Sequence, residues 1–388
     1  MFLYLILCNF VFYSPKILKL IMSGLLYQLA LTKIKSVGPV TARNIVSYCG
    51  SPEEVFRQSK KSLSKIPSIG LKTAEEILSN KVLPEAEKEL EFIRKNKINH
   101  HFYLDKTYPS RLKNHSDSPV MLFSQGNINF EHPRTLGIVG TRQPTEQGSL
   151  FCEKLIDDLQ EFDISIISGL AYGIDAISHQ TAIKNGMQTI GILGTGIDRT
   201  YPAVNRNLRN KMTAKGGVAT EFTSGTGPDK ENFPMRNRII AGLSDAVLVI
   251  ESGLKGGSMI TAHMAFGYNK DVFAIPGRIN DPMSSGPNYL IKSNIAGLIE
   301  SATDLTEKMM WQKSTKIHPV QLQLFYELSK DEQKILSIIR EDDQQCPHVD
   351  TIQYYSGFVH SKLTGIILGL ECKNLIKSLP GSRFMLKI

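Results

Sequence analysis

Between residues 135 and 277 the chain alternates short apolar runs with longer amphipathic stretches. The runs are LGIVG (Leu136–Gly140), ISIISG (Ile164–Gly169), TIGILG (Thr189–Gly194), GVATEF (Gly217–Phe222), AVLVIE (Ala246–Glu251) and DVFAIPG (Asp271–Gly277). Uniformly apolar strands are buried on both faces, and helices between them make parallel crossover connections. The pattern predicts an α/β fold with a doubly wound, Rossmann-like, mostly parallel sheet. In such sheets ligands bind at the carboxyl ends of the strands.

Residues 32–78 contain an internal repeat. The segment TKIKSVGPVTARNIV aligns with SKIPSIGLKTAEEIL at an offset of 32 residues, which matches Gly38 with Gly70. Each copy predicts a helix end, a glycine turn and a second helix, which is the helix-hairpin-helix pattern. The hairpin glycine and the next helix N-terminus of this motif can approach a phosphate. Neither copy has the second glycine of strong DNA-binding versions, so DNA contact and a packing or protein-contact role both stay open.

The C-terminal part predicts a separate small module. Three helical stretches, DEQKILSIIRE, VDTIQYYSG and HSKLTGIILGLECKN, precede a short β-like pair with a Pro-Gly turn. This is the element order of a winged helix, whose third helix would be the recognition helix. That helix offers only His360, Lys362 and Lys373 against one glutamate, so protein contact is favoured over duplex recognition.

Five parts are therefore expected along the chain. They are an uncertain extension (1–21), a helix-hairpin-helix domain (22–83), a Rossmann-like domain (84–304), a linker (305–327) and a winged-helix domain (328–388). The extension begins with the apolar run MFLYLILCNFVFY, which is shorter than the roughly 20 residues of a membrane span. No lysine or arginine precedes that run, unlike in a signal peptide. An over-extended start or a loose tail before Met22 is preferred to a membrane anchor.

Composition and charge narrow the class of partner. The chain is 41% hydrophobic and 21% charged, as soluble globular proteins are, and its net charge of +8 favours a polyanionic partner. The cysteines are scattered, without CxxC spacing, at positions 8, 49, 152, 346 and 372. This pattern argues against a disulfide framework and against a zinc site, and a reducing cytoplasm fits it best.

Glycine-rich loops with hydroxyl and basic side chains follow the predicted strands. Glycine allows close backbone approach to an anion, helix N-termini offer free amides, and arginine can bind a phosphate through two N–H groups. Several such positions at one sheet edge suit a polymer better than one small phosphate. The residues expected to contact DNA are Gly140, Thr141, Arg142, Ser168, Gly169, Gly173, Phe233, Arg236, Asn237, Arg238, Lys255, Gly256, Gly257 and Ser258.

Each feature also has a simpler interpretation. Loops such as SGLAYGID often bind a nucleotide or only form turns. The arginines of FPMRNR would form a surface salt-bridge cluster if no anion neutralised them, which we regard as the weaker interpretation. Asp175 and His179, four residues apart, could suggest acid–base chemistry, but capping and packing are preferred for such a pair.

Enzyme motifs are absent from the sequence. There is no GxGxxG with a following acidic residue, no GxxxxGK[ST] loop, no GxSxG elbow and no HExxH. We therefore expect a binding protein rather than an enzyme, with no cofactor and no metal.

Four motifs in order, VGTR, SGLAYGIDAISH, FPMRNRIIAGLS and KGGSMITAHMA, resemble the DNA-processing protein A family (DprA/Smf). The resemblance implies a protein that binds incoming single-stranded DNA during natural transformation, protects it and loads the RecA recombinase. It also implies a homodimer through the Rossmann-like domain and no membrane partner. By motif, the family's DNA-binding residues correspond to Arg142, to the region of Arg236 and Arg238, and to Lys255.

The chain departs from the family pattern in two places. Tyr172 stands where the family usually has arginine in SGLARGID, so no phosphate role is assigned to it, although it could stack on a base. Lys255 stands where a serine is frequent. A rival interpretation is a nucleotide-processing enzyme of the lysine-decarboxylase-like Rossmann group, but GGSMITAHMA lacks that group's glutamate.

Overall fold

The computed structural model describes residues 15–79, 81–313, 328–342, 346–373, 375–379 and 381–386. The chain divides into two compact units, residues 1–314 and 315–388. Within the described ranges, none of the helices combines the length and apolarity needed to cross a bilayer.

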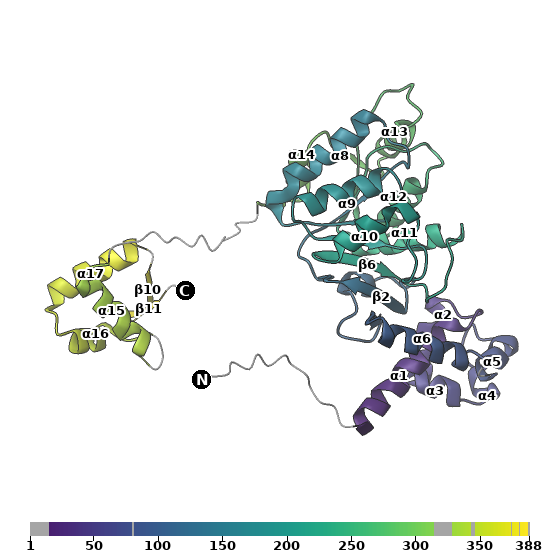
Figure 1. Cartoon of the computed structure of the whole chain (residues 1–388), viewed down its shortest axis with the longest axis horizontal. Helices are drawn as coiled ribbons and strands as arrows, with labels where there is room; N and C mark the ends of the chain where they lie inside the picture. The colour runs from purple at the N-terminus through teal and green to yellow at the C-terminus, as the bar shows by residue number, and fades with distance from the viewer. Residues whose placement is uncertain are drawn as a thin grey trace. The chain divides into compact units, whose positions relative to one another are not determined.

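The described part of the larger unit contains a nine-stranded sheet in the order β1-β2-β6-β5-β4-β3-β7-β8-β9 (Figure 1). The strands are β1 (Asn99–Phe102), β2 (Met121–Gly126), β3 (Thr135–Val139), β4 (Ser165–Ser168), β5 (Thr189–Ile192), β6 (Gly216–Thr220), β7 (Ala246–Val249), β8 (Asp271–Ala274) and β9 (Gly297–Leu298). Strands β1, β2 and β6 pair antiparallel, and all other pairs are parallel. The predicted doubly wound sheet and its six core strands are confirmed, whereas β1, β2 and β9 were not predicted.

Alternation along the strands explains why both faces of the sheet are buried. On β3, Leu136 and Ile138 face one core, and Val139 faces the other. The first core also contains Leu155 of α8 and Ile174 of α9, while the second contains residues of α11, α12 and α13. The helices of this α/β layer are α7 (Ser110–Lys113), α8 (Glu146–Leu159), α9 (Ile174–Lys184), α10 (Arg206–Met212), α11 (Asn232–Leu243), α12 (Gly257–Gly267), α13 (Ser285–Lys292) and α14 (Ala302–Lys308), with short 3-10 turns η1 (Gln160–Phe162) and η2 (Ala203–Asn205).

The described N-terminal helices gather beside β2, the strand next to the β1 edge of the sheet (Figure 1). They are α1 (Pro15–Lys33), α2 (Pro39–Cys49), α3 (Pro52–Arg57), α4 (Lys60–Leu63), α5 (Leu71–Leu78) and α6 (Leu83–Lys95). Gly38 and Gly70 take nearly the same backbone angles before α2 and α5, as the repeat predicts. Helix α1 starts ahead of Met22, the expected domain start, and residues 1–14 lie outside the described ranges.

The helical module is joined to the sheet by packing and by a buried carboxylate. Leu29 of α1 and Leu90 of α6 share a core with Phe123 of β2. Glu89 is 3% exposed and accepts hydrogen bonds from the amide (2.9 Å) and hydroxyl (2.7 Å) of Ser224. These contacts hold the N-terminal helices and the α/β layer together within one unit.

The larger unit continues beyond Asp304, where the sequence places its end. Leu305 is fully buried, Met309 and Trp311 pack against the same core, and the Trp311 amide donates to the Thr306 carbonyl (2.8 Å). The first residues of the predicted linker therefore belong to this unit, because the apolar residues in them cover the sheet. Residues 314–327 of the predicted linker lie outside the described ranges.

The described part of the smaller unit has three helices followed by an antiparallel hairpin. These elements are α15 (Lys330–Glu341), α16 (Val349–Ser356), α17 (His360–Cys372), β10 (Ile376–Leu379) and β11 (Arg383–Leu386). Ile335, Ile352 and Leu363, one from each helix, form its core with Ile376 and Phe384 of the hairpin. The element order matches the prediction, and the assignment of the unit as a winged helix stays a prediction.

Candidate nucleic-acid interface

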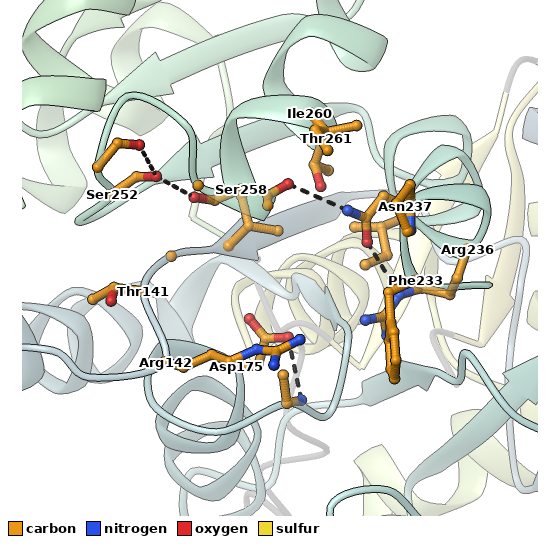
Figure 2. Close-up of a pocket in the computed structure, with 18 of the residues that line it drawn as sticks. Thr141, Arg142, Asp175, Phe233, Arg236, Asn237, Ser252, Ser258, Ile260 and Thr261 are labelled. Carbon is orange, nitrogen blue, oxygen red and sulfur yellow. Dashed lines mark hydrogen bonds between the residues drawn. The ribbon is translucent and has the colours of Figure 1, made fainter. Parts of the chain in front are cut away.

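A cavity of about 820 Å³ lies where the strand order of the sheet reverses, between β3 and β7. From β3 the chain proceeds through β4, β5 and β6 on one side and then crosses to β7 on the other, so the loops after β3 and β7 diverge. Figure 2 shows Thr141 and Arg142 after β3, Ser252 and Ser258 around the start of α12, and the first residues of α11 around this cavity. The cavity occupies the position that the doubly wound topology predicts for a ligand.

The structure brings most of the predicted DNA-contacting residues to this one cavity. Those that line it are Gly140, Thr141, Arg142, Phe233, Arg236, Asn237, Gly256, Gly257 and Ser258. Those that do not line it are Ser168, Gly169, Gly173, Arg238 and Lys255. Their role in binding stays a prediction, but the two groups have different surroundings.

Arg142 is an exposed cation in the lining of the cavity. Its guanidinium lies 5.7 Å from the centre of the Phe233 ring, within cation–π range, and within the described residues it forms no ion pair. Its loop is fixed from β7, because the Thr141 amide donates to the Glu251 carbonyl (2.7 Å) and the Glu251 carboxylate accepts from the amide (2.9 Å) and hydroxyl (2.6 Å) of Thr145. Glu251 thus positions a side chain that is free to bind an anion.

Arg236 differs from Arg142 because it is buried, with 4% of its surface exposed. It donates to the carbonyls of Gly169 and Ile192, just after β4 and at the end of β5, and its Nε donates to Asn237 (3.1 Å). Burial lowers the pKa of Arg236 to about 10, and Asp175 opposes that lowering, so the side chain is charged at neutral pH. The Arg236 guanidinium therefore places a positive charge beside the cavity, although its N–H groups are already hydrogen-bonded to backbone carbonyls.

The backbone amides of the SGLAYGID loop donate hydrogen bonds to a carboxylate within the same loop. Asp175 accepts the amide N–H groups of Gly169 (3.1 Å) and Ala171 (3.3 Å), and the Ser168 hydroxyl donates to the Ile138 carbonyl (2.6 Å). Burial raises the pKa of Asp175, which Arg236 opposes. These donors are therefore already used within the protein, and DNA contact by Ser168, Gly169 and Gly173 stays a prediction.

Glycine is required in this loop on steric grounds. A Cβ on Gly169 would lie 2.5 Å from the Arg236 guanidinium. At Gly173, φ is +71° and a Cβ would lie 2.4 Å from the Thr141 carbonyl oxygen. Gly169 thus leaves room for the Arg236 guanidinium, and Gly173 lets the loop after β4 approach the backbone of Thr141 and Arg142.

The surroundings of His179 support a packing role for the Asp175 and His179 pair. It is fully buried, and its Nδ1 lies 2.6 Å from the Thr189 hydroxyl. Burial lowers the pKa of His179 to about 3, so the ring is neutral under physiological conditions. Acid–base chemistry would require a proton-exchanging group in contact with a substrate, which this buried ring is not.

Arg238 does not line the cavity that Arg236 lines, and its contact with DNA stays a prediction. Residues two apart on a helix point about 200° apart, so the two arginines of FPMRNR leave α11 on different sides. Arg238 is 8% exposed and pairs with the buried Glu221 carboxylate at 2.5 Å. Its charge is therefore balanced inside the protein. Lys255 is exposed and lies outside the cavity lining, two residues before α12.

The start of α12 presents backbone amides and hydroxyls to the cavity. Gly256 and Gly257 precede and begin this helix, and the Ser258 hydroxyl donates to Ser252 (2.7 Å). A Cβ on Gly256 would lie 2.2 Å from the Ser252 Oγ, whereas one on Gly257 would meet nothing within 4 Å. This arrangement suits an anion near the helix N-terminus.

Lys230 and Tyr201 are among the cavity residues that sequence reasoning missed. Lys230 is exposed just before α11, three positions ahead of Phe233, and forms no ion pair in the described part of the chain. Tyr201 is 41% exposed, and its ring lies 5.5 Å from that of Phe233. The nearness of Lys230 to FPMRNR was a usable signal, whereas Tyr201 comes from a distant loop. Tyr172, considered for base stacking, is exposed but does not line the cavity.

A metal centre is not evident at this site. Among the described residues, no group of three or more His, Cys, Asp or Glu side chains is arranged to hold a metal ion. The lining instead combines cations, hydroxyls, amides and aromatic rings.

Residues 99–310, more than half of the chain, match the family model described as DNA recombination-mediator protein A. The chain belongs to this family. The resemblance noted from VGTR, SGLAYGIDAISH and the two later motifs is thereby confirmed. Residues 29–79 match a SAM-like helix-hairpin-helix tandem, in agreement with the internal repeat.

The chain is similar to several characterised proteins, including one curated sequence and two solved structures. Protein Smf of Synechocystis is 36% identical over 259 residues, which span 64% of this chain and 64% of that protein. The crystal structure of DNA processing protein A from Streptococcus pneumoniae is 31% identical, with a TM-score of 0.64, and covers 75% of this chain and 98% of that one. DNA processing protein A from Helicobacter pylori, studied for its single-stranded DNA binding mode, is 27% identical, with a TM-score of 0.51, covering 56% of this chain and 98% of that one.

Proposed function

We propose that this chain binds single-stranded DNA in the cavity between β3 and β7. The observation that carries the proposal is the charge balance of the lining, in which Arg142, Lys230 and Arg236 face one carboxylate, Asp175. Exposed cations without internal partners bind phosphates, and phosphate contacts dominate affinity for nucleic acids. The N-terminus of α12 adds amide donors at the same place.

Single strands are favoured over duplex because of the aromatic side chains. Phe233 and Tyr201 can stack on unpaired bases, which a duplex keeps within its own stack. The other contacts are directed to the backbone, so the binding is tolerant of sequence. The single-stranded DNA binding mode described for the Helicobacter pylori relative supports this choice.

The strand is held without being cut. Asp175 and His179, which the sequence offers as an acid–base pair, are buried and used for packing. The rival nucleotide-processing chemistry would need an acid in GGSMITAHMA, where the sequence has none. Incubation with nucleoside monophosphates tests this rival directly, and release of free base would support it over DNA binding.

The cellular role follows from the family. We infer that the protein acts in natural transformation in the cytoplasm, where it protects incoming single strands and loads the RecA recombinase, as a homodimer through the Rossmann-like domain. Membership of the recombination-mediator family supports this role. Sedimentation measures the dimer, and a RecA filament-assembly assay on DNA coated with single-strand-binding protein measures the loading.

The decisive experiment is competition among single strand, duplex and RNA of matched sequence across salt. Fluorescence anisotropy of a labelled oligo-dT strand gives the affinity, and the slope of its logarithm against the logarithm of salt counts the phosphate contacts. Stronger binding of the single strand, with a negative slope, is expected. Equal or tighter duplex binding would reject the proposal.

A further inference from the structure

A second cavity of about 540 Å³ adjoins the first. The two share Tyr201 and Pro228 in their linings, so they meet at this pair of residues. The second cavity is formed by the loop after β5 (195–200), the start of α10, and Phe92 and Asn96 at the end of α6. It therefore lies where the N-terminal helices meet the α/β layer.

The second cavity is also positively charged. Arg199, Arg206 and Arg209 line it together with a single acid, Asp198. Asp198 lies 3.7 Å from Arg199, whose side chain is 51% exposed. Arg206 is exposed and, among the described residues, forms no ion pair. Two exposed arginines therefore line this cavity, and Asp198 is the one carboxylate in its lining.

Arg209 holds the loop that carries Arg199 through hydrogen bonds to the backbone of that loop. It is 8% exposed and donates to the carbonyl of Arg199 (3.1 Å), to the carbonyl of Ile197 and to the Gln125 side chain (2.8 Å). Burial and the nearby Arg206 lower the pKa of Arg209. The fold thus uses one buried arginine to fix the loop that carries Arg199, although clustering three arginines is unfavourable without an anion.

Tyr201 separates the two cavities and is suited to a base. The residue is 41% exposed, and the centre of its ring lies 5.5 Å from that of the Phe233 ring in the first cavity. Successive bases of a single strand can stack on two such rings, while the phosphates on either side reach Arg142 and Lys230 in one cavity and Arg199 and Arg206 in the other.

We propose that the bound single strand continues from the first cavity over Tyr201 into the second, where Arg199 and Arg206 bind its phosphates. This inference rests on the proposed function of the first cavity. A strand accounts for the continuity of the two cavities, since a mononucleotide would fill only one of them. The N-terminal helices then contribute to the DNA path through the end of α6.

The test compares strand lengths. Affinity of the full chain for oligo-dT from about 4 to about 24 nucleotides is measured for the wild type, for Arg199→Gln with Arg206→Gln, and for a matched control, Lys154→Gln with Lys308→Gln, on exposed positions outside both cavities. The first double variant should bind long strands about tenfold more weakly, lose about 1.4 from the salt slope, and keep wild-type affinity for the shortest strands. The control should match the wild type.

Three outcomes would overturn the inference. One is unchanged affinity of the Arg199 and Arg206 variant at every length. Another is an equal loss for short and long strands, and the third is the same loss in the control. Failure of the wild type to bind any strand would instead reject the proposed function itself, so the two failures are distinguishable.

Photocrosslinking of the wild type gives a second measurement that needs no variant to fold. A strand carrying 5-iododeoxyuridine is irradiated with the full chain, and the adduct is mapped by mass spectrometry. An adduct on Tyr201 is expected with long strands. Adducts confined to residues outside both cavities would overturn the proposed path.

Discussion

The Asp175 carboxylate accepts the amide of Gly169 at 3.1 Å, at the place where the sequence suggests a phosphate. The loop after β4 therefore carries its own anion, and the buried Arg236 lies close enough to act on the charge of Asp175. The consequence is a division of labour within the site. Arg236 and Asp175 support the cavity wall from the protein interior, and the exposed Arg142 and Lys230 remain available for the proposed contact with DNA.

The double change Arg142→Ala with Lys230→Ala should weaken oligo-dT binding about tenfold or more near physiological salt and reduce the salt slope by about 1.4. Neither side chain forms an ion pair among the described residues, so the free energy of unfolding in urea should fall only by the loss of the Arg142–Phe233 cation–π contact, about 0.5–1 kcal/mol. Anisotropy titrations over a salt series check the affinity. Lys154→Ala with Lys308→Ala serves as the charge-matched control, and an equal loss in that control would contradict the prediction.

Gly173→Ala should destabilise the protein, whereas Gly257→Ala should not. At Gly173 the added Cβ collides with backbone and φ is positive, while at Gly257 it meets open space. The cost at Gly173 should be about 1–3 kcal/mol in urea unfolding. Because Gly173 also supports the Arg142 loop, DNA affinity should fall in the Gly173 variant as well. Equal stability of the two variants would show that the loop relaxes freely.

Arg238→Met should destabilise the fold without acting on DNA directly. It leaves the Glu221 carboxylate buried without its partner, which costs about 3–5 kcal/mol. Adding Glu221→Gln removes that buried charge and should recover most of the loss. Urea unfolding of the single and double variants measures this, and the folded double variant should bind oligo-dT as the wild type does. A loss of DNA affinity in a stable double variant would show instead that Arg238 contributes to DNA binding.

The burial of His179 predicts that the folded protein loses stability in acid. Its pKa is about 3 in the folded protein against 6.5 for an ordinary histidine, so the folded state favours the neutral ring. Because the unfolded chain takes up a proton at this histidine below pH 6.5 and the folded protein does not, the folded state loses stability as the pH falls from 6.5 toward 3. Above pH 6.5 the ring is neutral in both states and this loss is absent. Relative to neutral pH, about 2 kcal/mol should be lost at pH 5 from this residue. Comparison of unfolding free energies for wild type and His179→Gln isolates the effect, since other groups titrate in both. Parallel pH curves would refute the assignment.

Deletion of residues 328–388 should leave oligo-dT binding largely intact. The two cavities lie wholly within the larger unit, and the smaller unit has its own core. Anisotropy of the shortened chain, with circular dichroism to establish folding, measures the effect. A tenfold loss in a folded truncated chain would assign DNA contact to the C-terminal helices and hairpin.

The sequence by itself determines the layered α/β fold, because six uniformly apolar runs separated by helices leave few other ways to bury both faces of a sheet. It also determines the helix-hairpin-helix repeat, since Gly38 and Gly70 recur with their neighbours. The loops after β3 and before α12 were predicted as site elements for the same reason, as they follow the ends of buried strands.

Only the tertiary structure decided which side chains face the cavity. FPMRNR does not reveal that Arg236 turns inward to two carbonyls and Arg238 turns to Glu221, because helix rotation and the position of a distant acid settle both. SGLAYGID does not reveal that its amides are already used by Asp175. Tyr201 and Arg206 join the site through a loop and a helix remote in sequence, and such long-range proximity arises from packing, which local patterns do not encode.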